Sequence, residues 1–536
     1  MRVSEEGIQD RQQWEEKGYR LPNFERKLVC ERTRKSPVWI HFGGGNIFRA
    51  FLAELAQELL DQGECDAGVI VASGRESISQ IYRPADQLCL SVTLKGDGTL
   101  KKKVIGSITE SLIMESEGED WSRLKEIFES PTLQMATFTI TEKAYKLTDS
   151  KGDYLPAVLD DFLNGPEAPK SYMGKTAALC LARYRRGSLP LALVSMDNYS
   201  RNGEQLFRSV RAFAEAWVKN GQAEAGFLGY IDDPARLSFP WTMIDKITPG
   251  PDETVRERLR RDGVEGLEAL RTQRRTNTSV FVNAEETGYL VVEDQFPNGR
   301  PPLEKVGVIF TDRETVNKTE RMKVGTCLNP LHSSLAIFGC LLGYRYIWQE
   351  MKDPQLTSLI EKIGREEGLP VAENPGILDP GEFMDTVIHK RFSNPFVPDS
   401  PQRIAVDLSQ KIPIRFGNTL KAYEKTPGLC AASLNYIPLV FAGYLRYLMG
   451  VDDEGNSMAV SPDPLKEELQ GYLSGIHLGD SEIPPGSLQP ILSNERIFGL
   501  DLYEAGLGNK VEGYFMELLQ GAGAVRRTLE KYLPAR

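Results

Sequence analysis

Three polar side chains of different chemistry lie close together beside one apolar run of the chain. Lys323 can exchange a proton, Asn329 can donate a hydrogen bond to an oxygen, and His332 can do either. Apolar residues then recur at helical spacing as far as Leu342. Pro330 fits best as the first residue of this helix, with Asn329 as its N-cap. On these residues alone, the simpler alternative is a capped helix beside a surface lysine and a histidine satisfied by its neighbours.

The length and composition indicate a globular protein of two or more domains. A chain of 536 residues is too long for one ordinary core, and 41% hydrophobic with 26% charged residues is typical of soluble proteins. The net charge of -11 argues against a nucleic-acid binder. No stretch reaches the ~20 apolar residues that span a bilayer, and the N-terminus lacks the apolar core of a signal peptide. We expect a cytoplasmic monomer or small homo-oligomer without nucleic-acid or membrane partners.

The metal-binding residue types are sparse. The four histidines form no HxH or HExxH pair, and the seven cysteines form no CxxC pair. We therefore expect free thiols in a reducing compartment and no metal site.

A strand, a glycine turn and a helix follow one another near the start of the chain. The apolar segment 38–42 leads directly into Gly43-Gly44-Gly45, and apolar residues then recur at helical spacing to Leu59. This order cradles the pyrophosphate of a dinucleotide, although Phe48 stands where the usual GxGxxG pattern has its third glycine. An ordinary tight turn is the alternative. The cofactor-binding candidates here are Gly43, Gly45, Asn46, Ile47 and Phe48.

The second apolar strand, 68–72, ends in two candidates for the ribose edge of the cofactor. Glu76 could accept hydrogen bonds from an adenosine ribose, as in NAD-binding folds. Arg75 could instead face a 2′-phosphate, and a solvated turn is equally open. Further strands, 135–140 and 189–194, also end in polar residues, at the sheet edge where ligands bind in open α/β folds.

The character of the sequence changes near residue 310. The proline-flanked segment 239–249 reads as a loop, and 291–300 continues an irregular stretch. Beyond 311, long helical patterns dominate, and Arg391 to Pro395 reads as a polar turn that interrupts them. We predict an N-terminal extension (1–35), an α/β Rossmann-like dinucleotide-binding domain (36–310) and a mostly α-helical substrate domain (311–536).

Several segments, in order, resemble one family. They are IHFGGGNIFRAF, ADQLCLSVTL, FTITEKAY, SMDNYSRNG, FPWTMIDKITP, VVEDQFPNGRPPLE and RFSNP. Together they are similar to the polyol-specific long-chain dehydrogenases, the mannitol dehydrogenase family, from about 37 to 415. The resemblance implies a metal-independent secondary alcohol dehydrogenase with NAD as cofactor, NADP being less favoured. The remaining cofactor-binding candidates are Glu142 and Asp245, which lie in two of these segments.

The resemblance also assigns the catalytic residues. Met322-Lys323 and Asn329 to His332 match the two ends of the family motif MKxxxxNxxH, with one extra residue between lysine and asparagine. That residue predicts a break or π-bulge in the helix. Lys323 becomes the proton donor and base, with its pKa lowered by burial from the free value near ~10.4. Asn198 and Asn329 would hold the ketone oxygen, and His332 a neighbouring hydroxyl. We expect the site between the two domains.

Substrate choice depends on two cations. Arg391 matches the family's substrate-binding arginine, and a guanidinium favours a carboxylate. Lys411 could add charge. We expect reduction of fructuronate to mannonate or its reverse, with mannitol or tagaturonate chemistry as the alternatives. An alternative of another class is a non-catalytic dinucleotide-binding regulator, which would keep the glycine turn and lose the proton-transfer residues.

Overall fold

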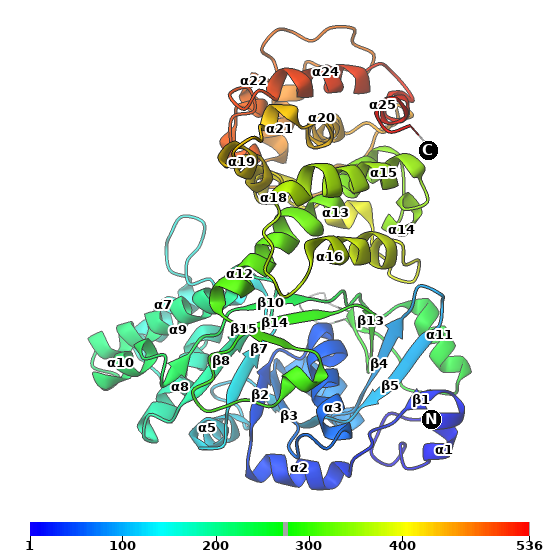
Figure 1. Ribbon diagram of the computed structural model, residues 1–536. Helices are drawn as coiled ribbons and strands as arrows, with labels where there is room; N and C mark the ends of the chain where they lie inside the picture. The colour runs from blue at the N-terminus through cyan, green and yellow to red at the C-terminus, as the bar shows by residue number, and fades with distance from the viewer. Residues whose placement is uncertain (272–276, 535–536) are drawn as a thin grey trace. The chain divides into compact units, whose positions relative to one another are not determined.

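The chain forms two compact units, Met1–Asn317 and Lys318–Arg536 (Figure 1). The structure is a computed structural model that describes residues 1–271 and 277–534.

A six-stranded parallel sheet forms the centre of the first unit. Its order, β6-β3-β2-β7-β8-β9, is the doubly wound order of dinucleotide-binding folds, in which the strand sequence reverses beside the first strand. Every residue of β2 and β8 is buried, as expected for strands covered on both faces. The predicted α/β Rossmann-like fold is confirmed. The strands are β2 (Trp39–Phe42), β3 (Val69–Ser73), β6 (Ile108–Ile113), β7 (Met135–Phe138), β8 (Leu191–Ser195) and β9 (Leu237–Ser238).

Two separate cores cover the faces of this sheet. Ile40 and Phe42 point into one core with helices α5, α7, α8, α9 and α10. Trp39 points into the other, with Leu52 and the helix α3. Figure 1 shows α5, α8, α9 and α10 gathered beside β7 and β8. The helix bounds are α3 (Ala53–Asp61), α5 (Trp121–Glu129), α7 (Pro156–Asn164), α8 (Tyr172–Arg185), α9 (Asn202–Lys219) and α10 (Gly226–Asp232).

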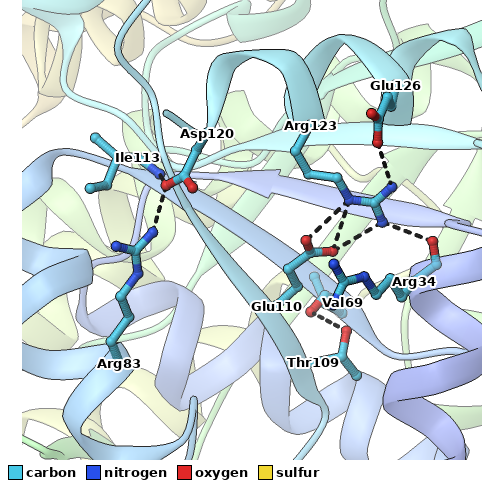
Figure 2. A network of polar contacts seen from close by, with 9 residues as sticks. All are labelled: Arg34, Val69, Arg83, Thr109, Glu110, Ile113, Asp120, Arg123 and Glu126. Carbon is cyan, nitrogen blue, oxygen red and sulfur yellow. Dashed lines mark hydrogen bonds and ion pairs between the residues drawn. The ribbon is translucent and has the colours of Figure 1, made fainter. Parts of the chain in front are cut away.

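Polar contacts fix the edge strand β6 to the start of α5. Arg123 of α5 lies 3.1 Å from Glu110 of β6, through Nε and Oε1. The Asp120 carboxylate accepts the backbone N–H of Ile113 at 2.7 Å and pairs with Arg83 at 2.7 Å (Figure 2). One of these contacts satisfies a backbone N–H at the C-terminal end of β6, and the others are ion pairs between side chains.

Two smaller sheets complete the first unit. The segment 1–35 contributes α1 (Arg11–Glu16), β1 (Tyr19–Arg20) and α2 (Arg26–Lys35), and β1 joins the sheet β1-β5-β4-β13. The other small sheet has the order β10-β14-β15. The remaining strands are β4 (Cys89–Leu94), β5 (Leu100–Ile105), β10 (Thr242–Asp245), β13 (Phe281–Glu285), β14 (Tyr289–Glu293) and β15 (Ile309–Thr311).

The prediction of a loop over 239–249 was wrong, as was an irregular stretch from 291. Thr242 to Asp245 pair with Tyr289 to Val292 in an antiparallel ladder. The prolines at 240 and 249 lie outside the strand, where they cost no ladder hydrogen bond. A four-residue strand whose partner is distant in sequence leaves little local signal.

The second unit is helical and packs around α13 (Asn329–Leu341), which is buried from Pro330 to its end. The helical run Arg313–Leu341 is long and apolar enough to cross a membrane by length and composition, but 89% of its apolar window is buried, as in a core helix. Surrounding elements include α14 (Ile347–Glu350), α15 (Pro354–Lys362), α16 (Pro380–Thr386), α17 (Pro401–Ile404), α18 (Leu408–Arg415), α19 (Gly417–Lys425), α20 (Tyr436–Leu448), α21 (Lys466–Leu473), α24 (Gly508–Leu518) and α25 (Ala524–Tyr532).

Candidate active site

The glycine turn lies at the switch point of the six-stranded sheet, immediately after β2. Gly43 has φ +114°, and a Cβ there would collide with the carbonyl oxygen of Thr139, which follows the neighbouring strand β7. Gly45 has open space around the position of a Cβ. Asn46 and Ile47 begin the following helix. The turn therefore combines a position that only glycine fits with a backbone that a ligand can approach closely.

Phe48 replaces the third glycine of the usual pattern because the helix packs differently here. Phe48 lies in a π-helical turn, η1 (Phe48–Leu52), and its ring stacks on His41 at 4.1 Å between centroids. The next residue, Arg49, is fully buried and donates to the Asn46 side-chain oxygen at 3.1 Å. The helix thus gains an aromatic contact with β2, and Arg49 fixes the side chain at the helix start.

The end of β3 distinguishes the two ribose candidates. Arg75 begins the short helix α4 (Arg75–Ser77), and its Nη2 pairs with Oε2 of Glu115 at 2.6 Å. Glu115 follows β6 in the sheet, and sequence reasoning did not identify it. Glu76 is half-buried beside Arg75. The positive charge of Arg75 is therefore already matched by a carboxylate, and this geometry favours Glu76 for an unphosphorylated ribose.

The ends of β7 and β8 are joined by a buried hydrogen-bond chain. The Tyr145 hydroxyl donates to Asp197 at 2.6 Å and lies 2.7 Å from the Ser195 hydroxyl. Burial raises the pKa of Asp197 to about 6. These hydrogen bonds hold the backbone next to Asn198, which is exposed just after β8. Tyr145 and Asp197 lie inside the segments TEKAY and SMDN. Their position in these two motifs was the available sign that they belong to the site.

The two remaining cofactor candidates lie on separate elements of the first unit. Glu142 is exposed at the start of α6 (Glu142–Tyr145), directly after β7. Asp245 is the buried last residue of β10 and pairs in register with Tyr289. Their contact with a cofactor stays a prediction.

In the second unit, Lys323 lies within a helix rather than in front of one. A π-helical turn, η5 (Lys323–Cys327), follows α12 (Arg313–Met322), and the Leu328 N–H donates to the Lys323 carbonyl at 3.1 Å. The predicted π-bulge is confirmed. Lys323 is only 8% exposed, which contradicts the alternative of a surface lysine. A π turn accommodates one extra residue without ending the helix.

The cap of α13 differs from the prediction by one residue. Leu328, with φ −131° and ψ −63°, is the N-cap, and Asn329 is the first helical residue. The chain reaches Leu328 from a helical turn, so its carbonyl can accept the His332 N–H at 3.0 Å without a side-chain cap. The Asn329 side chain is therefore not needed as a cap.

Two residues that sequence reasoning missed support the start of α13. Nε2 of His332 lies 3.0 Å from Oδ2 of Asp399, in the loop before α17. Arg415, at the end of α18, donates to the Ser333 hydroxyl at 2.6 Å and to the Asn329 carbonyl at 3.5 Å. Burial lowers the pKa of Arg415 to about 10. Neither residue belongs to a short motif, so only the fold brings them to this helix.

The candidate substrate cations have different surroundings. Arg391 is 5% exposed and belongs to another π-helical turn, η8 (Val387–Phe392), so the predicted polar turn begins only after Phe392. The π turn takes in an extra residue without ending the helix, so the helix continues through positions that read as a loop. The Lys411 ammonium donates to the carbonyls of Ile404 and Val406, and burial lowers its pKa to about 8. One of its three N–H groups remains for another partner.

Within residues 1–271 and 277–534, no group of three or more His, Cys, Asp or Glu side chains is arranged to hold a metal ion.

Comparison with known proteins gives one consistent family. The mannitol dehydrogenase Rossmann domain matches residues 38–305, and the mannitol dehydrogenase C-terminal domain matches 315–518. A D-mannonate oxidoreductase from Thermotoga maritima is 51% identical over 535 residues, which cover 99% of each chain. A D-mannonate oxidoreductase from Escherichia coli is 29% identical over 447 residues, covering 82% of this chain and 85% of its own.

Solved structures agree. The Pseudomonas fluorescens mannitol 2-dehydrogenase, in a ternary complex with NAD and D-mannitol, matches with a TM-score of 0.72, 27% identity and 100% coverage of both chains. A substrate-free D-sorbitol dehydrogenase shares the fold, with a TM-score of 0.78 and 22% identity.

Proposed function

Because the chain belongs to the mannitol dehydrogenase family, we propose that it is an NAD-dependent oxidoreductase that interconverts D-fructuronate and D-mannonate. The observation that carries this proposal is the 51% identity, over nearly the full length of both chains, to the D-mannonate oxidoreductase of Thermotoga maritima.

The first unit fits the cofactor. The turn Gly43 to Gly45 lies where the strand order reverses, and the polar ends of β3, β7 and β8 share that edge. In this proposal, Gly45 lets the backbone approach a pyrophosphate, and Glu76 binds the ribose hydroxyls. When bound, NADH supplies the hydride.

The side chains supply the remaining chemistry. Asn198 and Asn329 donate N–H groups to the ketone oxygen as it gains negative charge, and one such donor is worth about 3–4 kcal/mol in other enzymes. Lys323 then gives that oxygen a proton, and in the reverse direction it accepts the proton of the alcohol. His332 binds a neighbouring hydroxyl. The proposal requires Asn198 and Asn329 to reach one small substrate.

Arg391 is our candidate for the substrate carboxylate, because a guanidinium can form two parallel hydrogen bonds to it. Lys411, with two of its N–H groups on backbone carbonyls, has the smaller role.

The test is a spectrophotometric assay with NADH and D-fructuronate, compared with D-tagaturonate and D-fructose. We expect the highest kcat/KM with D-fructuronate. Preference for D-fructose would make the chain a mannitol 2-dehydrogenase, and no NADH oxidation with any of the three would favour a non-catalytic dinucleotide-binding regulator.

We further propose a cytoplasmic monomer or small homo-oligomer without nucleic-acid or membrane partners, in keeping with the net charge of -11.

A further inference from the structure

A buried carboxylate lies directly behind the His332 imidazole. Asp399 is 6% exposed, and its Oδ2 is 3.0 Å from Nε2 of His332. Its other oxygen, Oδ1, accepts hydrogen bonds from Arg403 at 2.6 and 3.0 Å. This contact meets the distance of a hydrogen bond but not its angle.

The imidazole is held from several sides. The Phe392 ring packs against it, with 4.9 Å between ring centroids. The charged groups that act on it are the Asp399 carboxylate and the guanidinium groups of Arg403 and Arg415. Burial lowers the pKa of His332, despite the opposing effect of Asp399. A neutral imidazole carries one N–H, and the partner of one ring nitrogen decides which nitrogen carries it.

We propose that Asp399 is a positioning residue, which holds the N–H of His332 on Nε2 and so presents Nδ1 as a hydrogen-bond acceptor to a substrate hydroxyl. This inference rests on the proposed function, in which His332 binds the hydroxyl next to the reacting ketone. Without the carboxylate, the ring could carry its proton on Nδ1. That nitrogen would then face the substrate hydroxyl as a donor and could not accept its hydrogen bond.

A second buried carboxyl group, that of Glu350, lies within electrostatic reach of Asp399. Its side chain is fully buried against Gly339 of α13, where a Cβ would collide with Oε1 of the glutamate. Within the described parts of the chain, neither oxygen of Glu350 has a hydrogen-bond partner. Burial, together with the charges of Asp399 and Asp353, raises the pKa of Glu350 well above its usual value. Burial and the lack of hydrogen-bond partners thus favour the neutral acid form of Glu350. Asp399 is the carboxylate that acts on the imidazole.

The decisive variant is Asp399→Asn, which preserves shape and removes the obligatory acceptor. We expect kcat/KM for D-fructuronate to fall by about 10- to 100-fold, the scale of one buried hydrogen bond to a charged group. Asp399→Glu, which restores a carboxylate, should recover part of this loss. Asp453→Asn is the matched control, because Asp453 is also buried and caps α25 through the N–H of Val525 at 2.8 Å.

A second measurement does not depend on turnover. The chain has only four histidines, so ¹⁵N NMR of histidine-labelled protein can assign His332 by comparison with His332→Gln. We expect the wild-type ring to be protonated on Nε2, and Asp399→Asn to shift the population toward Nδ1. Glu350→Gln should leave the tautomer unchanged, because the amide is as neutral as the acid.

The two proposals can fail separately. If the wild-type protein reduces none of the keto sugars, the proposed function is wrong, whatever the tautomer. If the wild-type protein is active while Asp399→Asn keeps its kcat/KM and its His332 tautomer, the positioning role of Asp399 is wrong. A loss equal to that of Asp453→Asn with an unchanged tautomer would likewise show a merely structural carboxylate.

Discussion

The two units build their candidate sites from different parts of the polypeptide. In the first unit, the candidate glycine turn follows a parallel strand. Gly43 makes room for the backbone after the neighbouring strand, and the space beside Gly45 is open. In the second unit, Lys323 and Arg391 lie inside helices, each in a π-helical turn, and both are buried. In our proposal, the strand ends supply backbone donors for the cofactor. Interrupted helices place long polar side chains in an apolar interior.

The largest expected effect concerns the second unit. If Lys323 transfers the proton, Lys323→Ala should lower kcat for D-fructuronate by about 10²–10⁴, the usual scale of general acid–base catalysis. NADH binding, measured by fluorescence titration, should stay close to wild type, because the glycine turn belongs to the first unit. Added small amines should restore part of the rate. A variant within a few-fold of wild type would remove Lys323 from the mechanism.

Substitutions in the glycine turn of the first unit should instead weaken NADH binding. Gly43→Ala should lower both the unfolding temperature and NADH affinity, the latter by about 10-fold or more, since a Cβ at φ +114° collides with the Thr139 carbonyl. Gly45→Ala is the matched control. It should leave the unfolding temperature of the cofactor-free protein unchanged and weaken NADH only, because open space surrounds that position. Equal behaviour of the two variants would contradict the distinction drawn between these glycines.

The sequence predicted the first unit well because its signals are local. A buried strand, glycines and an amphipathic helix occupy adjacent residues, and their order is enough to predict the glycine turn after the first strand. It predicted the π turn at Lys323 only through the extra residue relative to the family motif. The partners Asp399 and Arg415 could not be predicted, because they reach α13 from distant segments whose sequences carry no motif. The strand Thr242–Asp245 was missed for the same reason, since its partner is remote.

Asp197 of the first unit should make the unfolding free energy depend on pH, a smaller effect than those above. The pKa of Asp197 is raised to about 6, so the folded protein holds this proton more tightly than the unfolded chain does. The stabilisation is complete below the unfolded pKa near ~3.9 and is lost as pH rises through 6. Wild-type unfolding free energy should therefore fall by about 1 kcal/mol per pH unit between these values, relative to Asp197→Asn. Urea unfolding at pH 4, 5 and 6.5 measures the difference, and parallel curves would contradict it.

The smallest effect tests how the ribose edge selects its cofactor. Arg75 pairs with Glu115 at 2.6 Å, but both side chains are largely exposed, so the pair itself contributes little. The consequence of the pair is electrostatic, because Glu115 neutralises the positive charge of Arg75 that a 2′-phosphate would need. Glu115→Gln should therefore raise the ratio of kcat/KM with NADPH to that with NADH by a few-fold, and Arg75→Ala in the same background should cancel the gain. Glu119→Gln removes an equal charge beside Arg83 instead and should change the ratio less. If Glu119→Gln raises this ratio as much, the effect is one of net charge, and the ion pair between Glu115 and Arg75 does not control cofactor choice.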